Sequence, residues 1–191
     1  ESYEANADAT TWTFKLRQGV EFHNGKTMTA DDVIPSFNHH RGKDTQSAGK
    51  AFLTAVKSIT KKGKYEVEFK LEEGNADFPS IVSSGQFPIV PATDGVLDWQ
   101  SYIGTGGFTL ENFEPGVRAN LKRNPNYFKS DRAHFDEIEM LSLLDTTARQ
   151  SAAMNGSVHS ISRVDPKTVH LMARVSNLKI AEATGTLHYS F

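Results

Sequence analysis

Residues 11–33 read TWTFKLRQGVEFHNGKTMTADDV, and this stretch decides the fold of the first part of the chain. At its start Trp12, Phe14 and Leu16 alternate with threonine, lysine and arginine. An alternation with a period of two gives a segment one apolar and one polar face, which is typical of a strand with one face buried. We therefore predict a half-buried strand that begins near Thr11.

The same stretch continues into a turn and the start of a helix. Asn24–Gly25 adopts positive φ angles easily, as a tight turn requires. Thr29 is followed three residues later by Asp32, the spacing of a capping box, in which two side chains satisfy backbone N–H groups at a helix start. Apolar residues at helical spacing follow, so we predict a helix that ends near Arg41.

These residues resemble a segment of the family 5 extracytoplasmic solute-binding proteins, the oligopeptide- and dipeptide-binding components of ABC importers. Two further blocks, in the family's order, are similar as well. Gly107 departs from the family pattern, where proline is usual, and residues 157–159 depart where Glu-Val-Asp is usual. The two further blocks are GTGGF, FEPG and RNPNYF at residues 104–108, 113–116 and 123–128, and DTTAR and MNG at residues 145–149 and 154–156.

The resemblance implies an α/β fold of the type II periplasmic binding protein kind, of which this chain holds lobe I only. It implies a small α+β sub-lobe over residues 1–95, a mixed-sheet α/β core over residues 96–184, and a hinge strand over residues 185–191. Because family members are more than twice this length, we expect the chain to be a fragment that lacks a second lobe. The resemblance also implies a periplasmic or extracytoplasmic location and ABC permease subunits as partners.

Composition excludes several other classes of protein. The 191 residues carry 21 basic and 23 acidic side chains, a formal net charge of -2, and no basic run longer than Lys61–Lys62, so we expect no nucleic-acid partner. No apolar stretch approaches the roughly 20 residues that a membrane-spanning helix needs. The chain has no cysteine, which excludes disulfides, thiolate metal sites and a thiol nucleophile.

Local patterns predict further elements in residues 1–95. Residues 65–71 alternate between apolar and charged side chains and should pair with the strand before them. Trp12, Phe14, Val67 and Phe69 should share one core. The predicted elements are a helix over 48–56, a strand over 56–60, a hairpin turn at 61–64, a strand over 65–71, a short helix over 77–82 and an extended segment over 87–91.

In residues 96–184 the pattern changes to strands that alternate with helices, which predicts crossover connections and some parallel pairing. Glu114–Pro115–Gly116 predicts the turn of a hairpin. Phe108, Leu121, Ile138 and Met140 should form a second core. The predicted elements are strands over 108–113, 117–121, 138–143, 158–161 and 178–181, a helix over 146–154 capped by Asp145, and a helix that begins at Asp165–Pro166.

Several residues suggest catalysis or metal binding, but a structural interpretation is favoured for each. His39 and His40 are neighbours on a helix and point about 100° apart, so we expect a solvated or capping pair and no metal site. Residues 104–107 lack the third glycine and the helix of a dinucleotide fingerprint, so we expect a structural turn. Asp136, Glu137 and Glu139 should form a solvated strand face. No hydrolase or nucleotide motif is present, and we predict neither an enzyme nor a cofactor.

The resemblance implies which residues contact a ligand. In such proteins two lobes close around the ligand, and peptide main chain is held by backbone pairing while side chains lie in roomy pockets. For Phe87, a place in the core is the favoured alternative. The charges that select a peptide terminus lie mostly in the lobe that is absent here. The implied ligand-binding residues are Gln46, Ser47, Ser83, Ser84, Gly85, Gln86, Phe87, Thr186 and His188.

Two rival functions remain open. The first is the binding of a nickel chelate or another small solute by a relative with this fold, and the second is a regulatory protein that uses the fold as a ligand-sensing domain. A ligand screen separates the first from peptide binding. The N-terminal region of the complete protein distinguishes a binding protein from a regulatory protein, because the first begins with a secretory signal and the second with a DNA-binding domain.

Overall fold

The computed structural model describes residues 1–182, which divide into two compact units. The first contains Glu1–Phe113 and Ala119–Glu139, and the second contains Glu114–Arg118 and the chain from Met140 onward. Each unit is described by itself below. The division at residue 95 stays a prediction, and the predicted hinge strand, with Thr186 and His188, lies outside the described residues.

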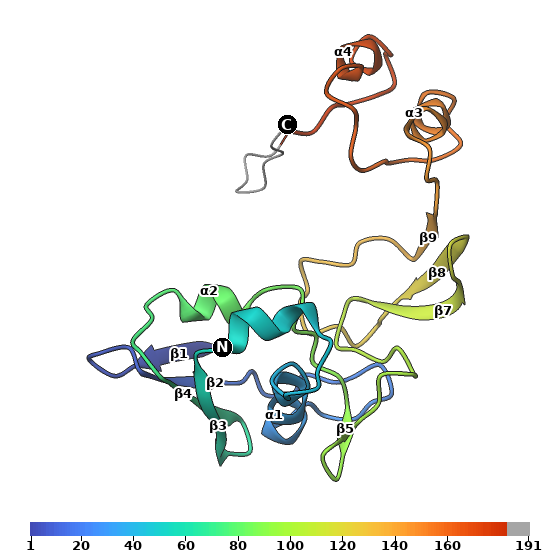
Figure 1. Ribbon diagram of the computed structural model, residues 1–191. Helices are drawn as coiled ribbons and strands as arrows, with labels where there is room; N and C mark the ends of the chain where they lie inside the picture. The colour runs from blue at the N-terminus through green and yellow to red at the C-terminus, as the bar shows by residue number, and fades with distance from the viewer. Residues whose placement is uncertain (183–191) are drawn as a thin grey trace. The chain divides into compact units, whose positions relative to one another are not determined.

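A four-stranded sheet forms the centre of the first unit (Figure 1). Its order is β1 (Ser2–Ala5), β2 (Thr11–Lys15), β4 (Glu66–Leu71) and β3 (Val56–Gly63), and every neighbouring pair is antiparallel. Trp12 is paired with Phe69 and Phe14 with Val67, so apolar side chains meet on one face of the sheet. The predicted strands and their pairing are confirmed.

The turn between β3 and β4 lies later than predicted. The sequence indicated a turn at residues 61–64, but β3 continues to Gly63, which pairs with Glu66. Two register shifts in β3, one of them between Lys61 and Gly63, extend the strand beyond the point where regular pairing would end it. The turn therefore consists of Lys64 and Tyr65.

Helix α1 (Ala30–His39) packs against β3 and β4 (Figure 1). The predicted capping box is confirmed: the Thr29 side chain accepts a backbone N–H bond, and the Asp32 carboxylate accepts the Thr29 N–H at 2.9 Å. Phe37 turns its ring edge-on to Phe69, with 5.2 Å between ring centroids. The buried core cluster consists of Trp12, Ala30, Val33, Phe37, Leu53, Val56, Val67, Phe69, Leu71, Phe78 and Phe87, with Phe14 packed against it.

Four short elements complete the connections of the first unit. They are the 3-10 helix η1 (Ala48–Leu53), helix α2 (Phe78–Val82) and the strands β5 (Ala92–Thr93) and β6 (Val96–Leu97). The β5–β6 hairpin was not predicted, although its turn, Asp94–Gly95, has positive φ at both residues. An Asp-Gly dipeptide is typical of a hairpin turn when alternating apolar residues flank it. Here each flanking strand has only two residues, so no alternation is visible in the sequence.

A three-stranded sheet contains β7 (Phe108–Glu114), β8 (Arg118–Arg123) and β9 (Glu137–Leu141) in that order. The predicted hairpin is confirmed, with Gly116 at φ +76° in its turn. The second predicted core is only partly correct. Phe108, Leu121 and Ile138 are half-buried, but Met140 is 59% exposed.

The second unit contains α3 (Thr146–Met154) and α4 (Val169–Met172). The Asp145 cap of α3 is confirmed, because its carboxylate accepts the Ala148 N–H at 2.7 Å. The helix predicted at Asp165–Pro166 begins only at Val169, since Asp165 forms a turn first.

The strands predicted over 158–161 and 178–181 are wrong. An isolated strand leaves its backbone groups unpaired, and the described part of this unit offers these segments no neighbouring strand. The parallel pairing expected from them does not form within residues 1–182, because neither segment is a strand there. The pairs among β1 to β6 are antiparallel. Among residues 1–182, no helix has both the length and the apolar character needed to cross a lipid bilayer.

Candidate ligand-binding loops

The implied ligand-binding residues within the described chain lie on two loops of the first unit. Gln46 and Ser47 precede η1, and residues 83–87 follow α2. Gln46, Ser83, Gly85 and Gln86 are exposed, so their side chains and backbone are available to a ligand. The loops are far apart in sequence, and the buried residues described below bring them together.

Phe87 lies in the core. Its ring is 7% exposed and stands 5.5 Å from the Phe37 ring, centroid to centroid. Its interpretation as a core residue is confirmed, and its side chain anchors the second loop. Burial of a phenylalanine side chain stabilises a fold by about 1.5–3 kcal/mol.

The second loop is held by short-range backbone bonds. Ser84 donates its N–H to Ile81 at 3.2 Å, and its own carbonyl accepts the Phe87 N–H at 3.1 Å. The Ser84 hydroxyl accepts the Gln86 N–H at 3.4 Å. These bonds fix the course of the backbone and leave Ser83 and Gln86 facing solvent.

The first loop is held by Ser47, which caps η1. Its hydroxyl accepts the Gly49 N–H at 3.1 Å and also pairs with Nδ1 of His40 at the end of α1. Thr45 in turn accepts the Ser47 N–H at 3.2 Å. The Ser47 carbonyl also accepts the Lys50 N–H at 3.1 Å, so Ser47 makes four local bonds, whereas its neighbour Gln46 is exposed.

Gly49 permits the two loops to meet. A Cβ atom at this position would lie 2.6 Å from Cε1 of Phe87 and 3.2 Å from Nδ1 of His40, which is closer than packed atoms approach. Only a residue without a side chain therefore fits between the first loop and Phe87. The close approach joins the loops through buried contacts.

His40 lies at the centre of this junction. Its ring is 6% exposed and stands edge-on to Phe87, with 5.1 Å between centroids. Of the expected solvated or capping pair, the solvated interpretation is wrong for His40, which is buried, and the capping interpretation fits it, because His40 is the C-cap of α1. His39 is exposed. Burial, together with the positive charge that His39 can carry, lowers the pKa of His40 below its ordinary value.

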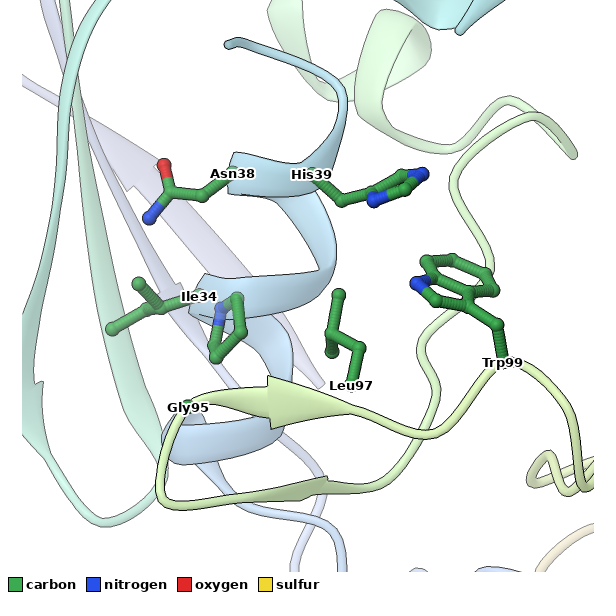
Figure 2. A pocket seen from close by; sticks show the side chains of 7 residues that line it. Ile34, Asn38, His39, Gly95, Leu97 and Trp99 are labelled. Carbon is green, nitrogen blue, oxygen red and sulfur yellow. The ribbon is translucent and has the colours of Figure 1, made fainter. Parts of the chain in front are cut away.

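A surface pocket of about 590 Å³ lies beside the junction. Figure 2 shows His39 of α1 directing its ring toward Trp99, with Leu97 of β6 pointing toward the helix between them. The His39 and Trp99 ring centroids are 4.7 Å apart. Trp99 and His40 were not identified as site residues from the sequence, since neither belongs to a periodic apolar pattern. The pocket is lined by Ile34, Pro35, Asn38, His39, Gly95, Leu97 and Trp99.

The glycine-rich segment 104–107 is a structural turn. His23 contacts it twice, through Nε2 at 3.0 Å from the Gly106 carbonyl and through Nδ1, which accepts the Gly104 N–H at 3.3 Å. A Cβ atom on Gly107 would lie 2.8 Å from Cβ of Ala133, so a larger residue does not fit here without movement. Within residues 1–182, no group of three or more His, Asp or Glu side chains is arranged to hold a metal ion.

A family model described as bacterial extracellular solute-binding proteins, family 5 Middle, matches residues 1–191. The chain belongs to this family. The family assignment from three sequence blocks is confirmed. The fold class is confirmed as well, as mixed helix and sheet with family 5 binding proteins as structural neighbours.

Two curated relatives and one further solved structure are similar to this chain. The oligopeptide-binding protein AppA of Bacillus subtilis is 30% identical over 178 residues, and its structure in complex with a nonapeptide matches 94% of this chain with a TM-score of 0.80. Di/tripeptide-binding protein 1 of Pseudomonas aeruginosa is 26% identical over 212 residues. NikZ of Campylobacter jejuni, solved with Ni(L-His), matches 92% of this chain with a TM-score of 0.78 at 18% identity, which shows a shared fold.

The chain spans only part of each relative. The sequence alignments cover 87% of this chain but 32% of AppA, and 97% of this chain but 39% of Di/tripeptide-binding protein 1. The structural match covers 36% of NikZ. The chain therefore corresponds to about a third of the length of these proteins.

Proposed function

We propose that this chain is part of an extracytoplasmic binding protein that captures di- to oligopeptides for import by an ABC transporter. The observation that carries the proposal is the match to AppA, which is named an oligopeptide-binding protein and was solved with a nonapeptide. Di/tripeptide-binding protein 1 supports the same ligand class by its name. Because the family is described as solute-binding proteins, we expect this chain to have a binding function and no enzymatic activity.

The chemistry of the two loops suits a peptide main chain. Gln46 and Gln86 present amide groups, which both donate and accept hydrogen bonds and carry no charge. The Ser83 hydroxyl donates to the Ser80 carbonyl at 2.8 Å and presents its oxygen as an acceptor. Such groups can pair with the N–H and C=O groups that every peptide shares, while water fills the space around variable side chains. Recognition of this kind tolerates many sequences.

Closure of two lobes completes the proposed mechanism. The described loops form one wall of the site, and the remainder of the binding protein supplies the opposite wall and the charges that select a peptide terminus. Enclosure removes water from the hydrogen bonds, which strengthens them, and the closed form is the state that the membrane permease recognises.

Isothermal titration calorimetry tests the proposal on the protein encoded by the complete reading frame that contains this chain. A pool of di- to pentapeptides should bind, and Ni(L-His) should not. Gln46→Ala and Gln86→Ala should each weaken peptide binding at least threefold, whereas the exposed control Gln18→Ala should leave it unchanged. Binding of Ni(L-His) without peptide binding would contradict the proposal.

A further inference from the structure

We propose that His40 is a positioning residue that holds both candidate ligand-binding loops in their places. Its effect on a ligand rests on the proposed function, but its effect on the loops does not. The proposal follows from one buried ring that touches both loops at once. On one side His40 pairs with Ser47, and on the other it packs edge-on against Phe87.

A hydrocarbon ring would fill this space at a lower cost. Nε2 of His40 is buried without a hydrogen-bond partner among the described residues, as is Nε1 of Trp99 nearby. An unsatisfied buried polar atom costs about 1–3 kcal/mol. What histidine offers here that phenylalanine lacks is the bond from Nδ1 to the Ser47 hydroxyl.

Hydrogen-bond accounting assigns the proton positions. The Ser47 hydroxyl oxygen accepts the Gly49 N–H at 3.1 Å, so its own proton is free to be donated. In the neutral form that we infer for His40, Nδ1 accepts that proton and the imidazole hydrogen lies on Nε2. In this arrangement one hydroxyl links the end of α1 to the start of η1.

Protonation of His40 would disfavour this arrangement. A proton on Nδ1 turns the acceptor into a donor, so the Ser47 hydroxyl must rotate its own hydrogen away, and the charge is buried beside Phe87. The neighbouring charged groups supply no compensation. His39 repels a second positive charge, Lys50 donates to the Lys43 carbonyl at 2.7 Å, and Arg41 donates to the carbonyls of Val56 and Lys57.

The carboxylates on the adjacent segments do not pair with His40. Asp98, one residue before Trp99, accepts the Ser101 N–H at 3.1 Å, and Asp44 is exposed in the first loop. Residues 83–87 contain no titratable side chain. The neutral form of His40 is therefore the form that holds the loops.

Amide hydrogen exchange on the 191-residue chain tests the positioning role. The N–H groups of Gly49 and Lys50, which bond to Ser47, and that of Phe87, which bonds to Ser84, are the reporters. His40→Phe keeps a ring but removes Nδ1, and it should speed exchange at Gly49 and Lys50 at least tenfold. His40→Asn places a polar atom near the position of Nδ1 and should restore most of the protection. The exposed neighbour variant His39→Gln is the control and should exchange as the parent does.

A double-mutant comparison separates the bond from packing. Ser47→Ala also removes the acceptor of the Gly49 N–H, so Lys50, which bonds to the Ser47 carbonyl, is the reporter here. Ser47→Ala should raise exchange at Lys50 as His40→Phe does, and the double variant should exchange there no faster than either single variant. Independent, multiplied effects would overturn the proposal. So would unchanged exchange in His40→Phe. With each rate divided by the intrinsic exchange rate at the same pH, lowering the pH from 7.5 to 5 should reduce the protection of Gly49 and Lys50 in the parent and leave their protection in His40→Phe unchanged.

Peptide titration of the complete protein tests the consequence for binding. His40→Phe should weaken peptide affinity at least fivefold, and His39→Gln should not. If the loops lose protection and the affinity stays unchanged, the loops do not act on the ligand through His40, and this part of the proposal is overturned. If the parent protein binds no peptide while His40→Phe loosens the loops, the proposed function fails and the positioning role stands.

Discussion

The backbone N–H of Ala92 donates a 2.9 Å hydrogen bond to the carboxylate of Asp32. Asp32 is fully buried, and the same carboxylate accepts the Thr29 N–H and pairs with Lys26. Lys26 also donates to the Ala92 carbonyl. One capping residue of α1 thus fastens the start of the β5–β6 hairpin to the helix.

Replacement of this carboxylate should destabilise the fold. In Asp32→Asn the Lys26 ammonium loses its counter-ion, and an amide cannot accept every bond that the carboxylate accepts. We expect a loss of about 1–3 kcal/mol in the free energy of unfolding, the cost typical of leaving buried polar groups without their partner, because the Lys26 side chain is 38% exposed and water can solvate its ammonium. Urea denaturation followed by circular dichroism measures it.

The neighbouring carboxylate provides the control. Asp31 is exposed and pairs with Lys61 at 2.7 Å, so Asp31→Asn should cost less than about 1 kcal/mol, as exposed ion pairs usually do. Equal losses in the two variants would show that burial and the bond to Ala92 contribute nothing.

A side chain at position 49 should destabilise the fold. In Gly49→Ala the added methyl group would meet the Phe87 ring, so the first loop or the ring must shift. We expect a loss of about 1–3 kcal/mol in unfolding free energy, as for other overpacked sites. Gly42→Ala, where a Cβ atom meets nothing within 4 Å, should be neutral or slightly stabilising in the same urea experiment.

The stability of the first unit should fall on acidification. Folding lowers the pKa of His40 below its usual value of 6.5, mainly through burial and also through His39. Just below pH 6.5 the unfolded chain therefore binds a proton at this residue that the folded chain does not, and stability is lost as the pH falls from 6.5 through the lower folded pKa.

The difference between the parent and His40→Phe isolates this contribution, because the other titratable groups are common to both. Urea denaturation midpoints measured between pH 8 and pH 5 should fall less steeply in His40→Phe. Parallel curves would show that His40 titrates alike in the folded and unfolded chain.

Elements that depend on neighbouring residues could be predicted from the sequence. The capping box at Thr29, the alternation in β4 and the cap at Asp145 each involve residues within a few positions of one another, so local chemistry decides them. The segments at 158–161 and 178–181 failed for the opposite reason. Whether an apolar run becomes a strand depends on a partner strand, which the run itself does not encode.

The candidate site divides in the same way. The resemblance placed Gln46 and residues 83–86 on loops, and the structure shows exposed loops there. It did not indicate His40 as their link, because the burial of a histidine at the end of a helix depends on Phe87 and Gly49, which lie elsewhere in the sequence. Tertiary packing decides such contacts, and no local signal reports them.

The last prediction concerns the 191-residue chain by itself. We expect it to fold, because the first unit has a core of eleven buried residues with satisfied helix caps. We expect it to bind peptides at least tenfold more weakly than the complete protein. With one wall of the site present, water competes for every hydrogen bond that the loops offer, and each such bond then contributes only about 0.5–1.5 kcal/mol. Calorimetric titration of both proteins with the same peptide pool measures the difference, and equal affinities would show that these loops carry the whole site and that no selecting charge from a second lobe is needed.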